Sequence, residues 1–192
     1  METNLTNQIE QVIAEIPKVE LHLHLEGAIP LETLFQFIQR KEPNSSIKSL
    51  DELRQKFTYT DFAHFIELWI WKNTFITDEG DFEEIAYQVL GDLSKQHVKY
   101  IEAFYSPGDF WEQGFSIPGI TEAIIAGKER AYRDFGIQSV FIIDLIRDHG
   151  PERGMRYLEE VTPYLGKGVI GIGLGGSEQN FPADPYAELY KE

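Results

Sequence analysis

Residues 137–146 read IQSVFIIDLI, an almost continuous apolar run. Such a run is typical of a parallel strand in an α/β protein, because helices cover both faces of the sheet. Three more segments have the composition of strands, at residues 19–25, 98–105 and 168–174. Helical patterns separate these strands, and residues 5–16 precede them with apolar side chains at helical spacing. The order β-α-β-α-β-α-β predicts a parallel α/β sheet.

Four βα units make up half of an eight-stranded TIM barrel, which typically takes about 250 residues. We therefore expect residues 1–192 to form the N-terminal half of one (β/α)8 barrel domain, holding only its first four βα units. The long connection between the first two strands predicts a helical insertion at about residues 41–96, and such insertions often cap active sites. An open half-barrel has two unpaired strand edges. We expect a second copy of the chain, or a C-terminal half, to cover them.

The composition excludes several classes of protein. Acidic residues outnumber basic ones by 32 to 17, and the net charge of −15 argues against a nucleic-acid or membrane partner. The chain has no cysteine, which excludes a disulfide scaffold, a thiolate zinc site and a cysteine nucleophile. The first residues lack the basic and apolar regions of a signal peptide, and no apolar run approaches the ~20 residues that span a bilayer. We therefore expect a cytoplasmic protein.

His22 and His24 lie two residues apart in the first expected strand. Residues at this spacing point to the same side of a strand, so the two imidazoles converge. Each could give a neutral nitrogen to Zn²⁺ at ~2.0–2.1 Å. The pair supplies two ligands, whereas a catalytic zinc takes at least three protein ligands and a water. Two ordinary hydrogen-bonded histidines are the alternative that the residues alone leave open.

The remaining histidines and one charged pair have other expected roles. His64 falls in a helical stretch and suits a solvent-side or lid position, and His97 precedes the second strand and suits the surface. His149 follows the third strand, where it could hydrogen-bond near the site. Asp144 and Arg147 stand at the end of that strand, and we expect them to form a structural ion pair at the barrel mouth.

Three segments resemble the adenosine deaminase family of metal-dependent hydrolases. They are PKVELHLHLEGAIPLETLF at 17–35, YIEAFYSP at 100–107 and GIGLGGSE at 171–178. The first is specific and the other two are supportive. The resemblance implies a TIM barrel with one Zn²⁺ at its C-terminal mouth, held in part by His22 and His24. This sequence departs from the family pattern at Gly173, because the family usually has an acidic residue at that position.

The resemblance also implies the residues that bind the substrate. Glu26 matches a position that is Asp in typical adenosine deaminases, where it contacts the ribose 5′-hydroxyl, and Gly176 matches the glycine whose N–H meets a purine ring nitrogen. Four residues match the hydrophobic lid that covers the substrate in the family: Phe62, Phe65, Ile66 and Trp69. Those four recur at i, i+3, i+4 and i+7 and share one helix face. Core packing is the alternative role for any single one of them.

The reaction that the resemblance implies is zinc-dependent hydrolytic deamination of a 6-aminopurine, converting adenosine to inosine and releasing ammonia. Because Glu26 replaces Asp, adenine and aminodeoxyfutalosine stay open as substrates. No catalytic acid or base is matched within this chain, because the family takes them from later strands. We therefore expect the chain alone neither to hold zinc tightly nor to deaminate. Two further alternatives are another amidohydrolase, which the flanking residues disfavour, and a non-catalytic truncated half-barrel.

Overall fold

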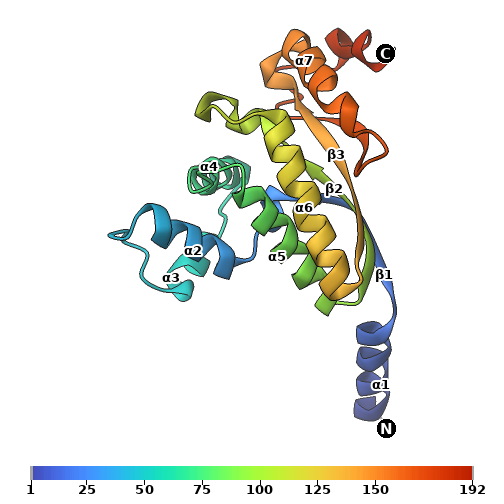
Figure 1. Ribbon diagram of the computed structural model, residues 1–192. Coiled ribbons are helices and arrows are strands. Elements are labelled where there is room, and N and C mark those ends of the chain that lie inside the picture. The colour runs from blue at the N-terminus through green and yellow to red at the C-terminus, as the bar shows by residue number, and fades with distance from the viewer. Residues whose placement is uncertain (1, 192) are drawn as a thin grey trace.

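The computed structural model describes residues 2–191, with side chains described from Gln8 onward. Four parallel strands form one sheet in the order β1-β2-β3-β4. The strands are β1 (Lys18–His24), β2 (Val98–Tyr105), β3 (Gln138–Ile146) and β4 (Val169–Gly175). The order follows the sequence, as in consecutive βα units of a barrel. The predicted parallel sheet of half a barrel is confirmed (Figure 1).

Seven α-helices accompany the sheet. They are α1 (Glu2–Glu15), α2 (Leu31–Lys41), α3 (Leu50–Lys56), α4 (Phe62–Asn73), α5 (Asp81–Lys95), α6 (Ile117–Phe135) and α7 (Pro151–Val161). Short 3₁₀ turns are η1 (Glu26–Ala28), η2 (Pro107–Gln113), η3 (Arg147–His149), η4 (Thr162–Tyr164), η5 (Asp184–Tyr186) and η6 (Leu189–Lys191). The connection from β1 to β2 carries α2 to α5. No helix within residues 2–191 is both long and apolar enough to cross a membrane.

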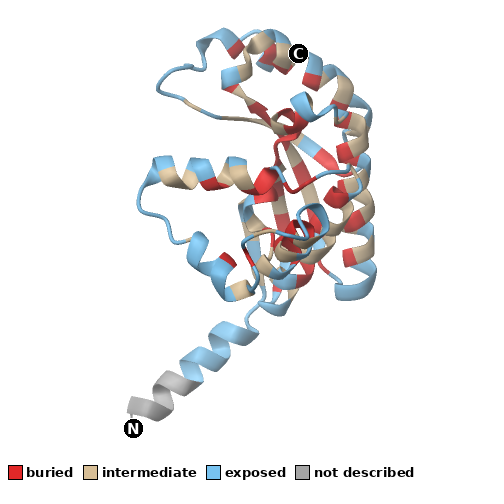
Figure 2. Ribbon diagram, turned by 90° about the vertical axis from the view of Figure 1, so that its left-hand side faces the viewer, coloured by how far each residue is buried: buried red, intermediate tan, exposed pale blue. Residues whose placement is uncertain are grey.

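The core lies between one face of the sheet and the helices α5 and α6, which run side by side along it (Figure 1). Alternate residues of the central strands are fully buried there, among them Ile101 and Tyr105 of β2 and Phe141 and Leu145 of β3. Figure 2 shows buried positions gathered along the strands and on the inner sides of these helices. The helices therefore cover one face, while the opposite face forms the open inside of the half-barrel.

Two expectations about burial need correction. The run at 137–146 is not buried on both faces, because Val140 and Ile142 point to the open side and are only half-buried. The predicted helix is present as α1, but it extends away from the sheet, and the apolar side chains described from Gln8 onward are exposed (Figures 1 and 2). Ile9, Val12, Ile13 and Ile16 are 51–62% exposed.

Candidate active site

His22 and His24 lie on the open face of the sheet, near the C-terminal end of β1. Their ring centroids are 5.4 Å apart, and both rings lie against Phe104 of β2, at 4.5 and 5.4 Å. Strand alternation produces this arrangement, since Leu23 between them points the other way. Burial, and then the neighbouring His22, lower the pKa of His24. Its imidazole is therefore held neutral, which is the form that binds a metal.

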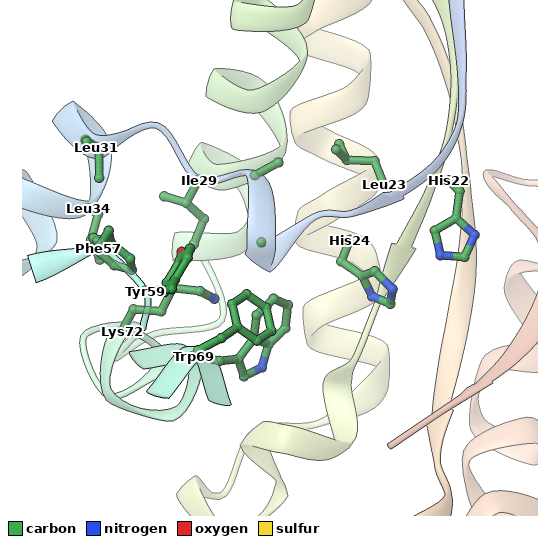
Figure 3. A pocket seen from close by; sticks show the side chains of 13 residues that line it. His22, Leu23, His24, Ile29, Leu31, Leu34, Phe57, Tyr59, Trp69 and Lys72 are labelled. Carbon is green, nitrogen blue, oxygen red and sulfur yellow. The ribbon is translucent and has the colours of Figure 1, made fainter. Parts of the chain in front are cut away.

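A cavity of about 400 Å³ opens beside the two histidines (Figure 3). Most of its lining is apolar or aromatic, with few polar groups. It is lined by His22, Leu23, His24, Gly27, Ala28, Ile29, Leu31, Leu34, Phe57, Tyr59, Phe65, Trp69 and Lys72. An apolar cavity with a few convergent polar groups is the usual form of a small-molecule site.

The four residues expected to form a lid all lie on α4, but only two of them line the cavity. Phe65 and Trp69 contribute to its wall. Phe62 is 76% exposed and Ile66 is 38% exposed, so both stand on the solvent side of the helix. In the structure, Phe65 and Trp69 thus lie beside the histidines, whereas Phe62 and Ile66 face the solvent.

The C-terminal half of α4 is anchored by polar contacts that sequence reasoning missed. Trp69 donates its Nε1–H to Asp109 Oδ2 at 3.2 Å. The Lys72 ammonium lies 3.8 Å from the centre of the Trp69 ring and donates to Asn73 Oδ1 at 2.9 Å. Burial lowers the pKa of Lys72 to about 8. Trp69 and Asp109 are forty residues apart in sequence, so no local pattern would have linked them.

Glu26 lies inside the protein rather than on the cavity wall. Its side chain is fully buried, and Oε1 accepts the backbone N–H of Ser106 at 2.8 Å. Among the described residues Oε2 has no hydrogen-bond partner. Burial raises the pKa of this carboxyl to about 7, against the attraction of Lys72. In this structure, contact with a substrate would require Glu26 to move.

Replacing Glu26 with glutamine is expected to change how stability depends on pH. The folded state keeps the Glu26 proton up to a pH of about 7, whereas the unfolded chain loses it near 4.5. Stability therefore falls as pH rises through this window. Glu26→Gln removes this pH dependence, so the variant should gain roughly 3 kcal/mol on the wild type between pH 4.5 and pH 7. Urea unfolding at several pH values across the window measures the difference.

The exposed Glu67→Gln variant of α4 is the matched control, because it removes a carboxyl from the surface of a neighbouring element. Its stability should run parallel to the wild type across the same pH range. If the Glu26→Gln curve were also parallel, burial would not be holding a proton on Glu26.

Asp144 and Arg147 do not form the ion pair that the sequence predicts. The Arg147 guanidinium instead donates to the carbonyls of Leu174 and Gly175, both at 3.1 Å. Asp144 points from β3 to the open face, where its Oδ2 lies 3.8 Å from His24 Nδ1. Burial, and then the charge of Asp109, raise the pKa of Asp144 to about 6. The prediction was wrong because each side chain meets a partner on another strand, Arg147 on the adjacent β4 and Asp144 on β1 across the open face.

Gly176 follows β4 directly and has a φ of +94°, a conformation that favours glycine. The next residue, Ser177, donates its N–H to Asp148 Oδ2 at 2.8 Å, and a Cβ at position 176 would overlap that oxygen. Gly176 thus lies just past the end of the fourth strand, at the same C-terminal end of the sheet as His24. It does not line the cavity described above.

The other three histidines lie away from the pair. His64 Nδ1 lies 3.2 Å from the Thr60 hydroxyl at the start of α4. His97 lies at the opposite end of the sheet, where its Nδ1 is 2.8 Å from the Glu15 carbonyl. His149 Nδ1 is buried and has no hydrogen-bond partner among the described residues.

The residues present fit part of a metal site. Two imidazoles on one strand, open to a cavity, are suitable zinc ligands. Within residues 2–191 no group of three His, Cys, Asp or Glu side chains is placed to hold a metal ion. The chain therefore offers two ligands of a larger set.

Comparison with known proteins supports the resemblance noted in the sequence. The family model described as adenosine deaminase matches residues 17–192. An adenine deaminase of Saccharomyces cerevisiae is 31% identical over 185 residues, which cover 94% of this chain and 53% of that protein. An adenine deaminase of Wolinella succinogenes is 28% identical over 184 residues, covering 96% and 55%. The chain thus spans about half the length of the curated relatives it matches.

Solved structures agree with the fold. The adenine deaminase of Arthrobacter aurescens superposes with a TM-score of 0.80 at 24% identity, covering 91% of this chain and 53% of that one. An amidohydrolase from Burkholderia ambifaria, solved with bound Zn, has a TM-score of 0.80 at 25% identity, covering 94% and 50%. The N6-methyl-AMP deaminase of Arabidopsis thaliana has a TM-score of 0.77 at 21% identity, covering 94% and 55%.

Proposed function

Because the chain belongs to the adenosine deaminase family, we propose that it forms the first half of the active site of a zinc-dependent aminopurine deaminase. The observation that carries this proposal is the pair of converging imidazoles, His22 and His24, beside an apolar cavity. When bound, zinc makes water nucleophilic near neutral pH and so supplies the attack on the purine C–N bond. His22 and His24 would hold that ion, and Phe65 and Trp69 would shield the side that faces the cavity from bulk water.

The cavity favours a flat heteroaromatic ring as the substrate. Aromatic rings line the cavity and offer faces and edges against which a purine can stack. They belong to Phe57, Tyr59, Phe65 and Trp69. A ribose would need several hydroxyl partners, yet the Glu26 side chain is turned inward, where its Oε1 accepts the Ser106 N–H. We therefore rank adenine before adenosine and aminodeoxyfutalosine. The names of the yeast and Wolinella relatives point the same way.

The proposed site needs further groups to be complete. The remaining zinc ligands, the acid that protonates the ring and the base that handles the water belong to the other half of a barrel. That half, or a second copy of the chain, would also pair with the open edges of β1 and β4. The proposed place of action is the cytoplasm.

Ammonia release tests the function. The product of the complete reading frame that contains these 192 residues is assayed with adenine, adenosine and aminodeoxyfutalosine, beside the 192-residue chain alone. We expect deamination by the former, with kcat/KM for adenine at least tenfold above the others, and none by the latter. Activity of the 192-residue chain would contradict the need for a second half. Absence of activity in both, with zinc bound or removed, would favour a non-catalytic half-barrel.

A further inference from the structure

Asp144 is the one carboxylate that closely approaches the histidine pair among the described residues. It lies on β3, on the same open face of the sheet, and its Oδ2 is 3.8 Å from His24 Nδ1. Although that face is open, the Asp144 side chain is only 5% exposed. Burying a carboxylate costs free energy unless it has a partner. The Gly175 backbone N–H and the charge of Arg147 offset part of that cost, and His24 is the side chain that forms a close charged contact with the carboxylate.

The neighbouring strand is shaped to admit this carboxylate. Three glycines of β4, at 171, 173 and 175, face the open side. A Cβ at Gly173 would lie 2.8 Å from Asp144 Oδ1, and one at Gly175 would lie 2.5 Å from Asp144 Oδ2. A Cβ at Gly171, one pleat further from the mouth, would meet nothing within 4 Å. Gly173 and Gly175 thus leave space for Asp144, and a Cβ at Gly173 would also lie 2.8 Å from Phe104 Cε1.

We propose that Asp144 is a positioning residue of the metal site, whose carboxylate orients the His24 imidazole from a space that Gly173 and Gly175 leave free. The inference rests on the proposed function. At 3.8 Å the contact is electrostatic rather than a direct hydrogen bond, and it favours the tautomer with a proton on Nδ1. The other ring nitrogen, Nε2, then presents its lone pair to a metal. A carboxylate behind a metal-binding histidine commonly has this effect on ring orientation and basicity.

Zinc affinity tests the proposal without relying on turnover. The zinc dissociation constant of the complete protein is measured by competition with a chelator for Asp144→Ala and the isosteric Asp144→Asn. We expect both to bind zinc 10–100-fold more weakly, as is usual when such a partner is lost. Thermal unfolding of the metal-free proteins shows whether each variant is folded. Asp144→Asn, which keeps the shape, preserves the test if Asp144→Ala does not fold.

The glycines provide a second arm with a matched control. Gly175→Ala should displace the carboxylate and weaken zinc binding, while Gly171→Ala on the same face should leave it within twofold. In the Asp144→Ala background, Gly175→Ala should add little, because the group that it displaces is already gone. Full additivity of the two changes, or wild-type zinc affinity in Asp144→Asn, would overturn the proposal.

The outcomes separate this inference from the proposed function. If the wild type binds zinc and deaminates while the Asp144 variants bind zinc equally well, the inference fails and the function stands. If the wild type neither binds zinc nor deaminates, the proposed function fails, and the positioning role fails with it.

Discussion

Alanine in place of His24 is expected to remove zinc from the complete protein and to lower kcat/KM for its aminopurine by about 10³ or more. In the proposed site, His24 is one of the two zinc ligands that the described residues would supply, and its ring lies beside the cavity. Polarisation by a metal contributes several kcal/mol to a transition state. Each 1.4 kcal/mol corresponds to a tenfold change in rate, so losing the metal gives a change of this size. Metal analysis of the purified protein and initial rates of ammonia release measure both effects.

His97→Asn is the matched control for that experiment. His97 lies at the opposite end of the sheet and has a φ of 62°, which asparagine tolerates better than most residues. This variant should keep its zinc and its rate. If the His24→Ala protein retained stoichiometric zinc and wild-type kcat/KM, the histidine pair would not be part of the active site.

The fold could be predicted from the sequence because its signals are local. The apolar run at 137–146 and the alternation at 19–25 each define a strand without knowledge of any other segment, and the helices between them impose parallel pairing. What covers a strand or helix is not a local property. The same apolar spacing that predicts α1 would suit a helix packed on the sheet, yet Val12 and Ile13 are exposed. Periodicity identifies an apolar face but not its partner.

The site could be predicted only where one element supplies it. His22 and His24 lie on one strand, so their convergence follows from a period of two. The approach of Asp144 to His24 depends on the register of three strands, and the burial of Glu26 depends on how η1 meets the end of β2. One sequence feature does point to Asp144. Glycine recurs at every second position of the fourth strand, which indicates that a side chain from a neighbouring strand occupies that face.

Gly127→Ala is expected to lower the free energy of unfolding by about 3 kcal/mol, although helix propensity alone predicts the opposite sign. Gly127 lies inside α6 at its contact with α5. A Cβ there would overlap the backbone carbonyl oxygen of Glu83 and would lie 2.8 Å from the Ala86 Cβ. A backbone atom in a packed helix cannot move aside as a flexible side chain can, so the two helices must separate. Overpacking of this kind costs about 1–3 kcal/mol, and loss of the surrounding contacts places this site at the upper end.

The sign of the change makes the experiment decisive. In an exposed helix, alanine in place of glycine stabilises by about 1 kcal/mol. Urea unfolding of Gly127→Ala therefore distinguishes a tight helix crossing from a loose one by the sign of the change in the free energy of unfolding as well as by its size. Glu129→Ala, two residues further along α6 and exposed, should change stability by no more than about 0.5 kcal/mol. Since α5 and α6 together cover β2 and β3, a stabilised Gly127→Ala protein would mean that the covering layer packs less closely than the structure shows.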